Sequence, residues 1–184
     1  QSAGETSLCT VGKEGSGLTY RGYTIEELAQ NAGFEEIAYM LLYGALPSIS
    51  ELEAYKQRLI SFRELPDSLK AALRLIPKEA HPMDVMRTGC SVLGNLEPEL
   101  SFDDQQDAAD RLLATLPGMI TYWYRYSHDG IEISTDTGQD STAGHFLKML
   151  SGKDPSDMHK SVMDCSLILY AEHEFNASTF TARV

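Results

Sequence analysis

The 184-residue sequence has few cysteines, few cations and no long apolar run. Its cysteines, Cys9, Cys90 and Cys165, are odd in number and far apart, so their spacing indicates neither a disulfide framework nor a metal motif. We expect reduced thiols, as in a cytoplasmic protein. No apolar segment approaches the roughly 18 residues that a membrane span needs, and no signal-peptide pattern opens the chain. These absences argue against a disulfide-stapled scaffold and against an integral membrane protein.

Positive charge is scarce: 15 lysines and arginines stand against 27 acidic residues, which gives a net charge of −12. Nucleic acid is therefore not an expected partner, because its phosphates require a basic surface. An anionic substrate is still compatible with this charge, since a few local arginines can define its site. Hydrophobic residues make up 42% of the chain, a value typical of a globular protein with a core.

Helical periodicity and capping signals dominate the chain. Two short extended segments, Cys9–Val11 and Leu18–Tyr20, flank a glycine-rich turn at 14–17 and predict a hairpin. Ser50 and Glu53 have the spacing of a capping box and predict the start of a helix. The sequence therefore predicts an all-α fold with at most a small N-terminal β-hairpin.

The middle of the chain predicts two further helices. Pro82 suits the first position of a helix. The apolar face of that helix is predicted to contain Met83, Met86, Cys90 and Leu93, with the helix ending at Gly94. A long helix is expected over 103–126, with a bend at Pro117.

The last full helix is expected to begin at Asp154 and Pro155. Between Val162 and Tyr170 it is apolar on nearly every side, which is typical of a buried helix. His173 would then lie at the end of a core element.

Several common catalytic motifs are absent from the sequence. His173 and Glu174 begin like a zinc-protease helix, but Ala177 stands where the second histidine ligand would be. The chain contains no GxxxxGK[ST] phosphate loop, no GxGxxG dinucleotide fingerprint and no GxSxG nucleophile elbow. The histidines are therefore the best candidates for chemistry.

Two of the five histidines stand out. His173 ends the apolar helix and is followed by the small polar residues Asn176, Ser178 and Thr179, so it suits catalysis better than packing. His145 follows a glycine and opens an apolar helical segment, where a core role competes with a substrate contact.

The other three histidines favour structural roles. His128 and His159 lie in polar surroundings and are expected on the surface. His81 precedes a proline at a helix start, which favours capping or packing.

Four segments in order resemble the citrate synthase family, most closely its 2-methylcitrate synthase branch. They are LTYRGY at 18–23, HPMDVMRTG at 81–89, GHFLKML at 144–150 and YAEHEFNASTF at 170–180. The resemblance covers the whole chain. It implies the N-terminal part of that family's large helical domain over 1–184, with the small domain and the C-terminal half absent, and a homodimer.

The resemblance also implies an activity. The family is a group of Claisen-type acyltransferases that condense an acyl-CoA with oxaloacetate, without a metal or an organic prosthetic group. Coenzyme A enters as the substrate thioester, propionyl-CoA in the 2-methylcitrate branch. By resemblance His173 is catalytic and donates a hydrogen bond to the acyl carbonyl, His145 binds oxaloacetate, and Asn176 supports the loop that shapes the pocket.

Other catalytic residues of the family have no match in this chain. Its second catalytic histidine, its aspartate base and the arginines that hold oxaloacetate are expected beyond Val184. We therefore expect the 184 residues alone to be inactive.

Two alternatives differ in substrate or in class. A citrate synthase of the same fold would use acetyl-CoA, which is one methylene smaller than propionyl-CoA. A non-enzymatic helical interaction module would fit the acidic surface and the helix content. It would leave the histidine and the polar cluster at 170–180 unexplained.

Overall fold

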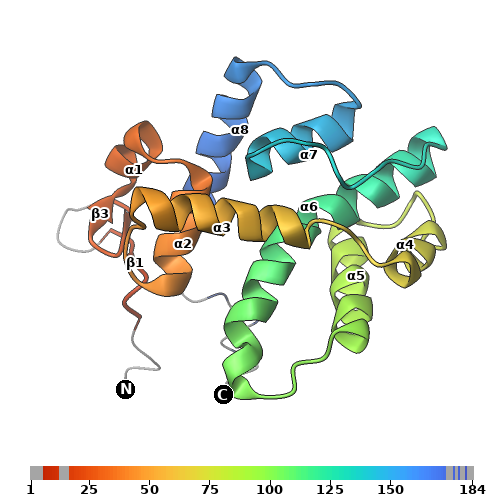
Figure 1. Cartoon of the computed structure of the whole chain (residues 1–184), viewed down its shortest axis with the longest axis horizontal. Helices are drawn as coiled ribbons and strands as arrows, with labels where there is room; N and C mark the ends of the chain where they lie inside the picture. The colour runs from red at the N-terminus through yellow and green to blue at the C-terminus, as the bar shows by residue number, and fades with distance from the viewer. Residues whose placement is uncertain (1–5, 13–16, 173–175, 177, 179–180, 182–184) are drawn as a thin grey trace. The chain divides into compact units, whose positions relative to one another are not determined.

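The computed structural model describes residues 6–12, 17–172, 176, 178 and 181. Backbone contacts divide the chain into two compact parts. The first part combines residues 1–53 with 161–184, and the second part contains residues 54–160. Within the described residues the fold is helical with one small sheet, so the predicted fold class is confirmed (Figure 1).

The sheet of the first part has three short antiparallel strands. The sequence predicted at most a hairpin, which has two strands, so the third strand was missed. Strand β1 (Cys9–Thr10) pairs with β2 (Thr19–Tyr20), which pairs with β3 (Tyr23–Thr24). Between β2 and β3 the chain reverses in two residues, Arg21 and Gly22, whose φ angles are 46° and 92°. Positive φ at both positions is typical of the tight turns that match the twist of paired strands. Glycine adopts it freely, and Arg21 accepts a rarer conformation.

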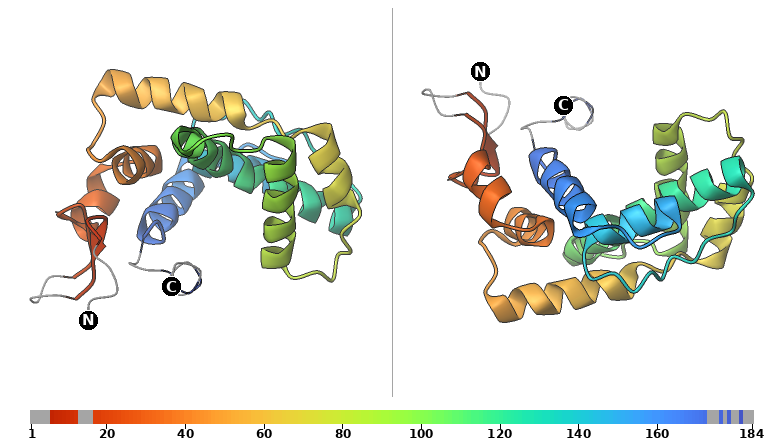
Figure 2. Two further views of the ribbon diagram at one scale, coloured as in Figure 1. Left: turned by 90° about the horizontal axis from the view of Figure 1, so that it is seen from below. Right: turned by 90° about the horizontal axis from the view of Figure 1, so that it is seen from above.

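Two helices follow the sheet in the first part, α1 (Ile25–Asn31) and α2 (Phe34–Tyr43). Helix α2 ends before Gly44, which has a φ of 104° and closes the helix as the sequence predicts. Helix α8 (Asp157–Leu169) lies beside α2 in all three views (Figures 1 and 2). The Asp164 carboxylate accepts the backbone N–H of Phe34 at 3.2 Å, so a side chain from α8 caps the first turn of α2.

The second part is built around α6 (Gln105–Asp129), which contacts the other helices of this part (Figure 2). These are α4 (Asp67–Arg74), α5 (Pro82–Leu96) and α7 (Thr142–Ser151). The core between α4, α5 and α6 contains Leu65, Leu69, Leu73, Val85, Leu93, Met119, Tyr122 and Trp123. Helix α6 continues through Pro117, as the sequence predicts, and the expected bend there stays a prediction.

Helix α3 (Ile49–Phe62) begins two residues earlier than predicted. Its first turn is closed by Ser48 and Glu51: the Glu51 N–H donates to Ser48 Oγ at 3.3 Å, and the Ser48 N–H donates to Glu51 Oε2 at 2.8 Å. The predicted box of Ser50 and Glu53 was therefore wrong. The two pairs overlap in sequence with the same spacing, so spacing alone does not choose between them.

The buried face of α5 also differs from the prediction. It contains Val85, Gly89 and Leu93, whereas Met83 is 64% exposed and the helix continues through Gly94 to Leu96. The sequence pattern missed this face because Gly89 has no apolar side chain to mark it. Its lack of a Cβ instead makes room for Met119 of α6.

Helix α8 was predicted to be buried from Val162 to Tyr170, and this was wrong for the described chain. Val162 is 66% exposed and Tyr170 is 85% exposed, and only Ile168 is fully buried. The helix also begins at Asp157 rather than at Asp154. A helix that is apolar on all sides is buried only where neighbouring elements cover every one of its faces. The described residues cover only the face of α8 that contains Ile168.

Candidate functional site

The residue with the strongest sequence signal, His173, lies outside the described residues, as do Glu174 and Phe175. Its proposed catalytic role therefore stays a prediction. The structure does describe Glu172, immediately before it, and Asn176 just after it.

Asn176 is exposed, and its side-chain oxygen accepts the N–H of Ser178 at 2.9 Å. Such a contact two residues ahead is typical of asparagine in a turn, where the side chain replaces a backbone acceptor. This local bond is compatible with a role in shaping the loop. Its role toward substrate stays a prediction.

His145 lies in the first turn of α7, where Ser141 caps the helix by accepting the N–H of Gly144 at 3.1 Å. Its side chain is only 1% exposed. Its Nδ1 lies 2.8 Å from the hydroxyl oxygen of Thr137, and its Nε2 has no hydrogen-bond partner among the described residues. Burial, with a smaller contribution from the positive charge of Arg63, lowers the pKa of His145 to about 3. The imidazole is therefore neutral at physiological pH, with one nitrogen donating and the other accepting.

The backbone beside His145 is tightly packed. A Cβ at Gly144 would lie 2.7 Å from Oε1 of Gln139, so only glycine fits without a shift of that side chain. Arg63 is 5% exposed, and its guanidinium donates to the carbonyl of Gln139. His145 is thus buried among polar groups of the second part, and its contact with oxaloacetate stays a prediction.

The chain that leads into His173 is anchored by the sheet of the first part. The Tyr20 hydroxyl donates to the carbonyl of Ile168 at 3.0 Å and accepts the N–H of Glu172 at 3.3 Å. The Cys9 thiol lies 3.7 Å from Oε1 of Glu172. Tyr20 is fully buried, which raises the pKa of its phenol and keeps it a donor. Sequence reasoning missed this role, although Tyr20 lies in the LTYRGY segment.

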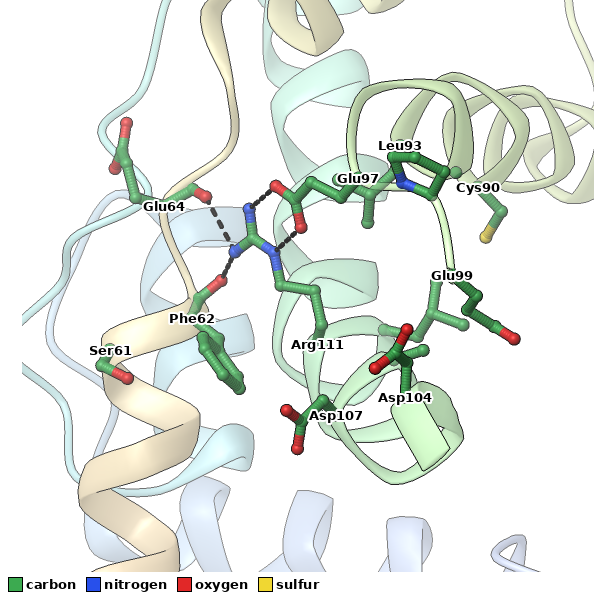
Figure 3. Close-up of a pocket in the computed structure, with 14 residues that line it drawn as sticks. Ser61, Phe62, Glu64, Cys90, Leu93, Glu97, Glu99, Asp104, Asp107 and Arg111 are labelled. Carbon is green, nitrogen blue, oxygen red and sulfur yellow. Dashed lines mark hydrogen bonds and ion pairs between the residues drawn. The ribbon is translucent and has the colours of Figure 1, made fainter. Parts of the chain in front are cut away.

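A cavity in the second part has a volume of about 880 Å³ and lies between α3, α5 and α6 (Figure 3). Its lining includes five carboxylates, those of Glu64, Glu97, Glu99, Asp104 and Asp107, and one cation, Arg111.

Arg111 does not offer this cavity a free positive charge. Its guanidinium holds both carboxylate oxygens of Glu97 at 2.9 Å and donates to the carbonyls of Phe62 and Glu64, as Figure 3 shows. A cavity with this charge disfavours oxaloacetate and the phosphates of coenzyme A. It contains none of the site residues predicted from the sequence.

The remaining histidines have the structural roles that the sequence predicts. His81 caps α5, with Nδ1 accepting the N–H of Met83 at 3.2 Å. His128 and His159 are exposed. Among the described residues, no group of three or more His, Cys, Asp or Glu side chains is arranged to hold a metal ion. No helix in the described ranges is long and apolar enough to cross a bilayer. None of the three cysteines forms a disulfide bond with a described residue.

Comparison with known proteins identifies the family. The model of the citrate synthase C-terminal domain matches residues 1–184, and the chain belongs to the citrate synthase family. It is 64% identical to a 2-methylcitrate synthase of Shewanella oneidensis over 184 residues, which are 100% of this chain and 49% of that protein. It is 40% identical to 2-methylcitrate synthase 2 of Corynebacterium glutamicum, over 97% of this chain and 49% of that protein.

Solved structures agree with this assignment. A citrate synthase of Thermoplasma acidophilum in a ternary complex with carboxymethyl coenzyme A and oxaloacetate has a TM-score of 0.87 and 28% identity. The match covers 95% of this chain and 46% of that one. A citrate synthase of Thermotoga maritima has a TM-score of 0.80 and 34% identity, with 97% and 46% covered. The chain spans about half the length of the curated relatives it matches.

Proposed function

We propose that this chain belongs to an enzyme that condenses propionyl-CoA with oxaloacetate and water to give 2-methylcitrate and CoA. The identity to the 2-methylcitrate synthase of Shewanella oneidensis over the whole chain is the observation that carries this proposal. It exceeds by far the 34–35% identity to the citrate synthases of Acidithiobacillus ferridurans and Heyndrickxia coagulans.

The difficult step of this reaction is removal of a weakly acidic proton beside the thioester. A base must take the proton while a hydrogen-bond donor stabilises the enolate oxygen that forms. We propose His173 as that donor, with Asn176 supporting the loop around it. We also propose that His145 contacts oxaloacetate as a neutral imidazole, a state favoured by its low pKa. No metal or organic prosthetic group takes part in the proposed mechanism.

The kinetics of His173→Asn, in a longer protein that contains this chain, test whether His173 stabilises the enolate rather than binding oxaloacetate. A donor to the enolate acts in the transition state, so its loss lowers kcat by about 100-fold to 1,000-fold. The KM for oxaloacetate is expected to stay close to that of the unsubstituted protein. A variant with normal kcat and a raised KM for oxaloacetate would instead assign His173 to binding of the second substrate.

The second candidate is citrate synthesis from acetyl-CoA, which the resemblance to the Thermoplasma enzyme favours. One methylene in an apolar pocket is worth about 1–3 kcal/mol, so the two thioesters are expected to compete for one site. The 184 residues alone are expected to release no CoA from either thioester. Turnover by a chain of verified mass would contradict that expectation.

Assembly as a homodimer and a cytoplasmic location are also part of the proposal. The exposed apolar side chains of Met83, Val162 and Tyr170 support self-association, because apolar surface is usually covered by a partner. The absence of disulfide bonds among the described residues is compatible with a reducing compartment. Sedimentation measures the first directly, and a single monomeric species across a concentration series would contradict it.

A further inference from the structure

Tyr20 connects the N-terminal sheet to the place where the chain leaves α8. It lies on β2, in the middle of the three-stranded sheet and opposite Cys9 on β1. Its side chain is fully buried, and its hydroxyl reaches a segment 148 residues further along the chain. Strands β1 and β2 are each two residues long, and their pairing is complete without the bond from the Tyr20 hydroxyl to Ile168.

The hydroxyl satisfies backbone groups on both sides of the helix end. The last carbonyls of any helix lack partners within the helix. Tyr20 donates to the carbonyl of Ile168 at 3.0 Å, with that of Leu169 at 3.4 Å, and accepts the N–H of Glu172 at 3.3 Å. One oxygen thus bonds both to the end of α8 and to the backbone of Glu172 beyond it.

Two further contacts hold the same helix and segment in place. The carboxylate of Asp164 accepts the N–H of Phe34, which fixes the middle of α8 against α2. The side chain of Glu172 meets the thiol of Cys9 at 3.7 Å. The backbone position of Glu172 is therefore set by the sheet, and His173 is the next residue in the chain.

We infer that Tyr20 is a positioning residue for the proposed catalytic His173, because its hydroxyl fixes the backbone from the end of α8 to Glu172, the residue before it. This inference rests on the proposed function of His173. It assigns the LTYRGY segment a role in the site even though Tyr20 touches no reacting atom. A small displacement of a catalytic group is enough to slow a reaction about 100-fold.

The test substitutes Tyr20→Phe in a longer, active protein that contains this chain, and Tyr55→Phe is the matched control. Tyr55 is also buried, and its hydroxyl donates to Asp110 at 3.1 Å, so each variant loses one buried phenolic hydroxyl. At a temperature where both variants are fully folded, kcat/KM is expected to fall about 10-fold to 100-fold for Tyr20→Phe. The value for Tyr55→Phe is expected to stay within about twofold of the unsubstituted protein. Equal values for the two variants would overturn the inference.

A second readout does not depend on activity. The ring resonance of His173, assigned by its loss in His173→Asn, is followed by NMR as the pH is changed. Tyr20→Phe is expected to shift its titration curve, and Tyr55→Phe is expected to leave it in place. If the unsubstituted protein releases no CoA, the proposed function fails, and this titration still decides the role of Tyr20. An unchanged resonance in Tyr20→Phe would overturn the positioning role even in an active enzyme.

Discussion

The fully buried carboxylate of Asp110 lies 2.8 Å from Nε of Arg58, which reaches it from α3. The Tyr55 hydroxyl donates to the other oxygen of the same carboxylate at 3.1 Å. A buried charge is tolerated only when it is paired and hydrogen-bonded. These contacts fix the second half of α3 to α6 within the second part.

Arg58→Met is expected to destabilise the protein strongly, because it leaves the Asp110 carboxylate buried without its cation. The Asp110 carboxylate is fully buried and the Arg58 side chain is 36% exposed, so the loss of this partner costs about 1–3 kcal/mol in the free energy of unfolding. Urea denaturation measures it. Arg87→Met is the control, since Arg87 is 76% exposed in its pair with Asp84 and its loss costs less than about 1 kcal/mol. Similar losses in both variants would contradict this account of Asp110.

Acid is expected to destabilise the protein in part through His145. Its pKa is about 3 in the folded state against an ordinary histidine value of 6.5, so between these values the unfolded chain binds the extra proton. Stability from this residue is therefore present above pH 6.5 and is lost as the pH falls toward 3. At pH 5 the loss amounts to about 2 kcal/mol.

His145→Gln is the variant that isolates this effect. The difference in the free energy of unfolding between pH 7.5 and pH 5 is expected to shrink by about 2 kcal/mol relative to the unsubstituted protein. His159→Gln, at an exposed position, is the control and is expected to keep the original pH dependence. An unchanged slope in His145→Gln would show that the imidazole is not held neutral by burial.

Two glycines of α5 are expected to respond oppositely to alanine. A Cβ at Gly94 meets nothing within 4 Å, so Gly94→Ala should stabilise the helix by up to about 1 kcal/mol. A Cβ at Gly89 would lie 2.9 Å from Sδ of Met119, and overpacking of this kind costs about 1–3 kcal/mol. Gly89→Ala is therefore expected to unfold at lower urea concentration than Gly94→Ala. The reverse order would contradict the close packing of α5 on α6.

Local signals in the sequence predicted much of the fold. Pro82 and His81 mark the start of α5, and Gly44 marks the end of α2, because these residues act on the backbone within one helical turn. The start of α3 was misplaced because two serine–glutamate pairs with the same spacing overlap, and only the structure shows that Ser48 closes the turn.

Contacts between distant residues were beyond the reach of the sequence pattern. The bond from Tyr20 to Ile168 joins positions 148 apart, and that between Phe34 and Asp164 joins positions 130 apart. Neither periodicity nor capping statistics contain this information. The same limit applies to α8, whose apolar residues predict burial without indicating which neighbour covers them.

The substrate preference of a longer protein that contains this chain tests the central claim most directly. CoA release is measured with saturating oxaloacetate and varied propionyl-CoA or acetyl-CoA, and kcat/KM is compared between the two thioesters. The proposed function predicts a higher value for propionyl-CoA, by about 10-fold to 200-fold if one methylene is recognised in an apolar pocket. A preference for acetyl-CoA would make the protein a citrate synthase, and no release from either thioester by the intact protein would contradict the proposed activity altogether.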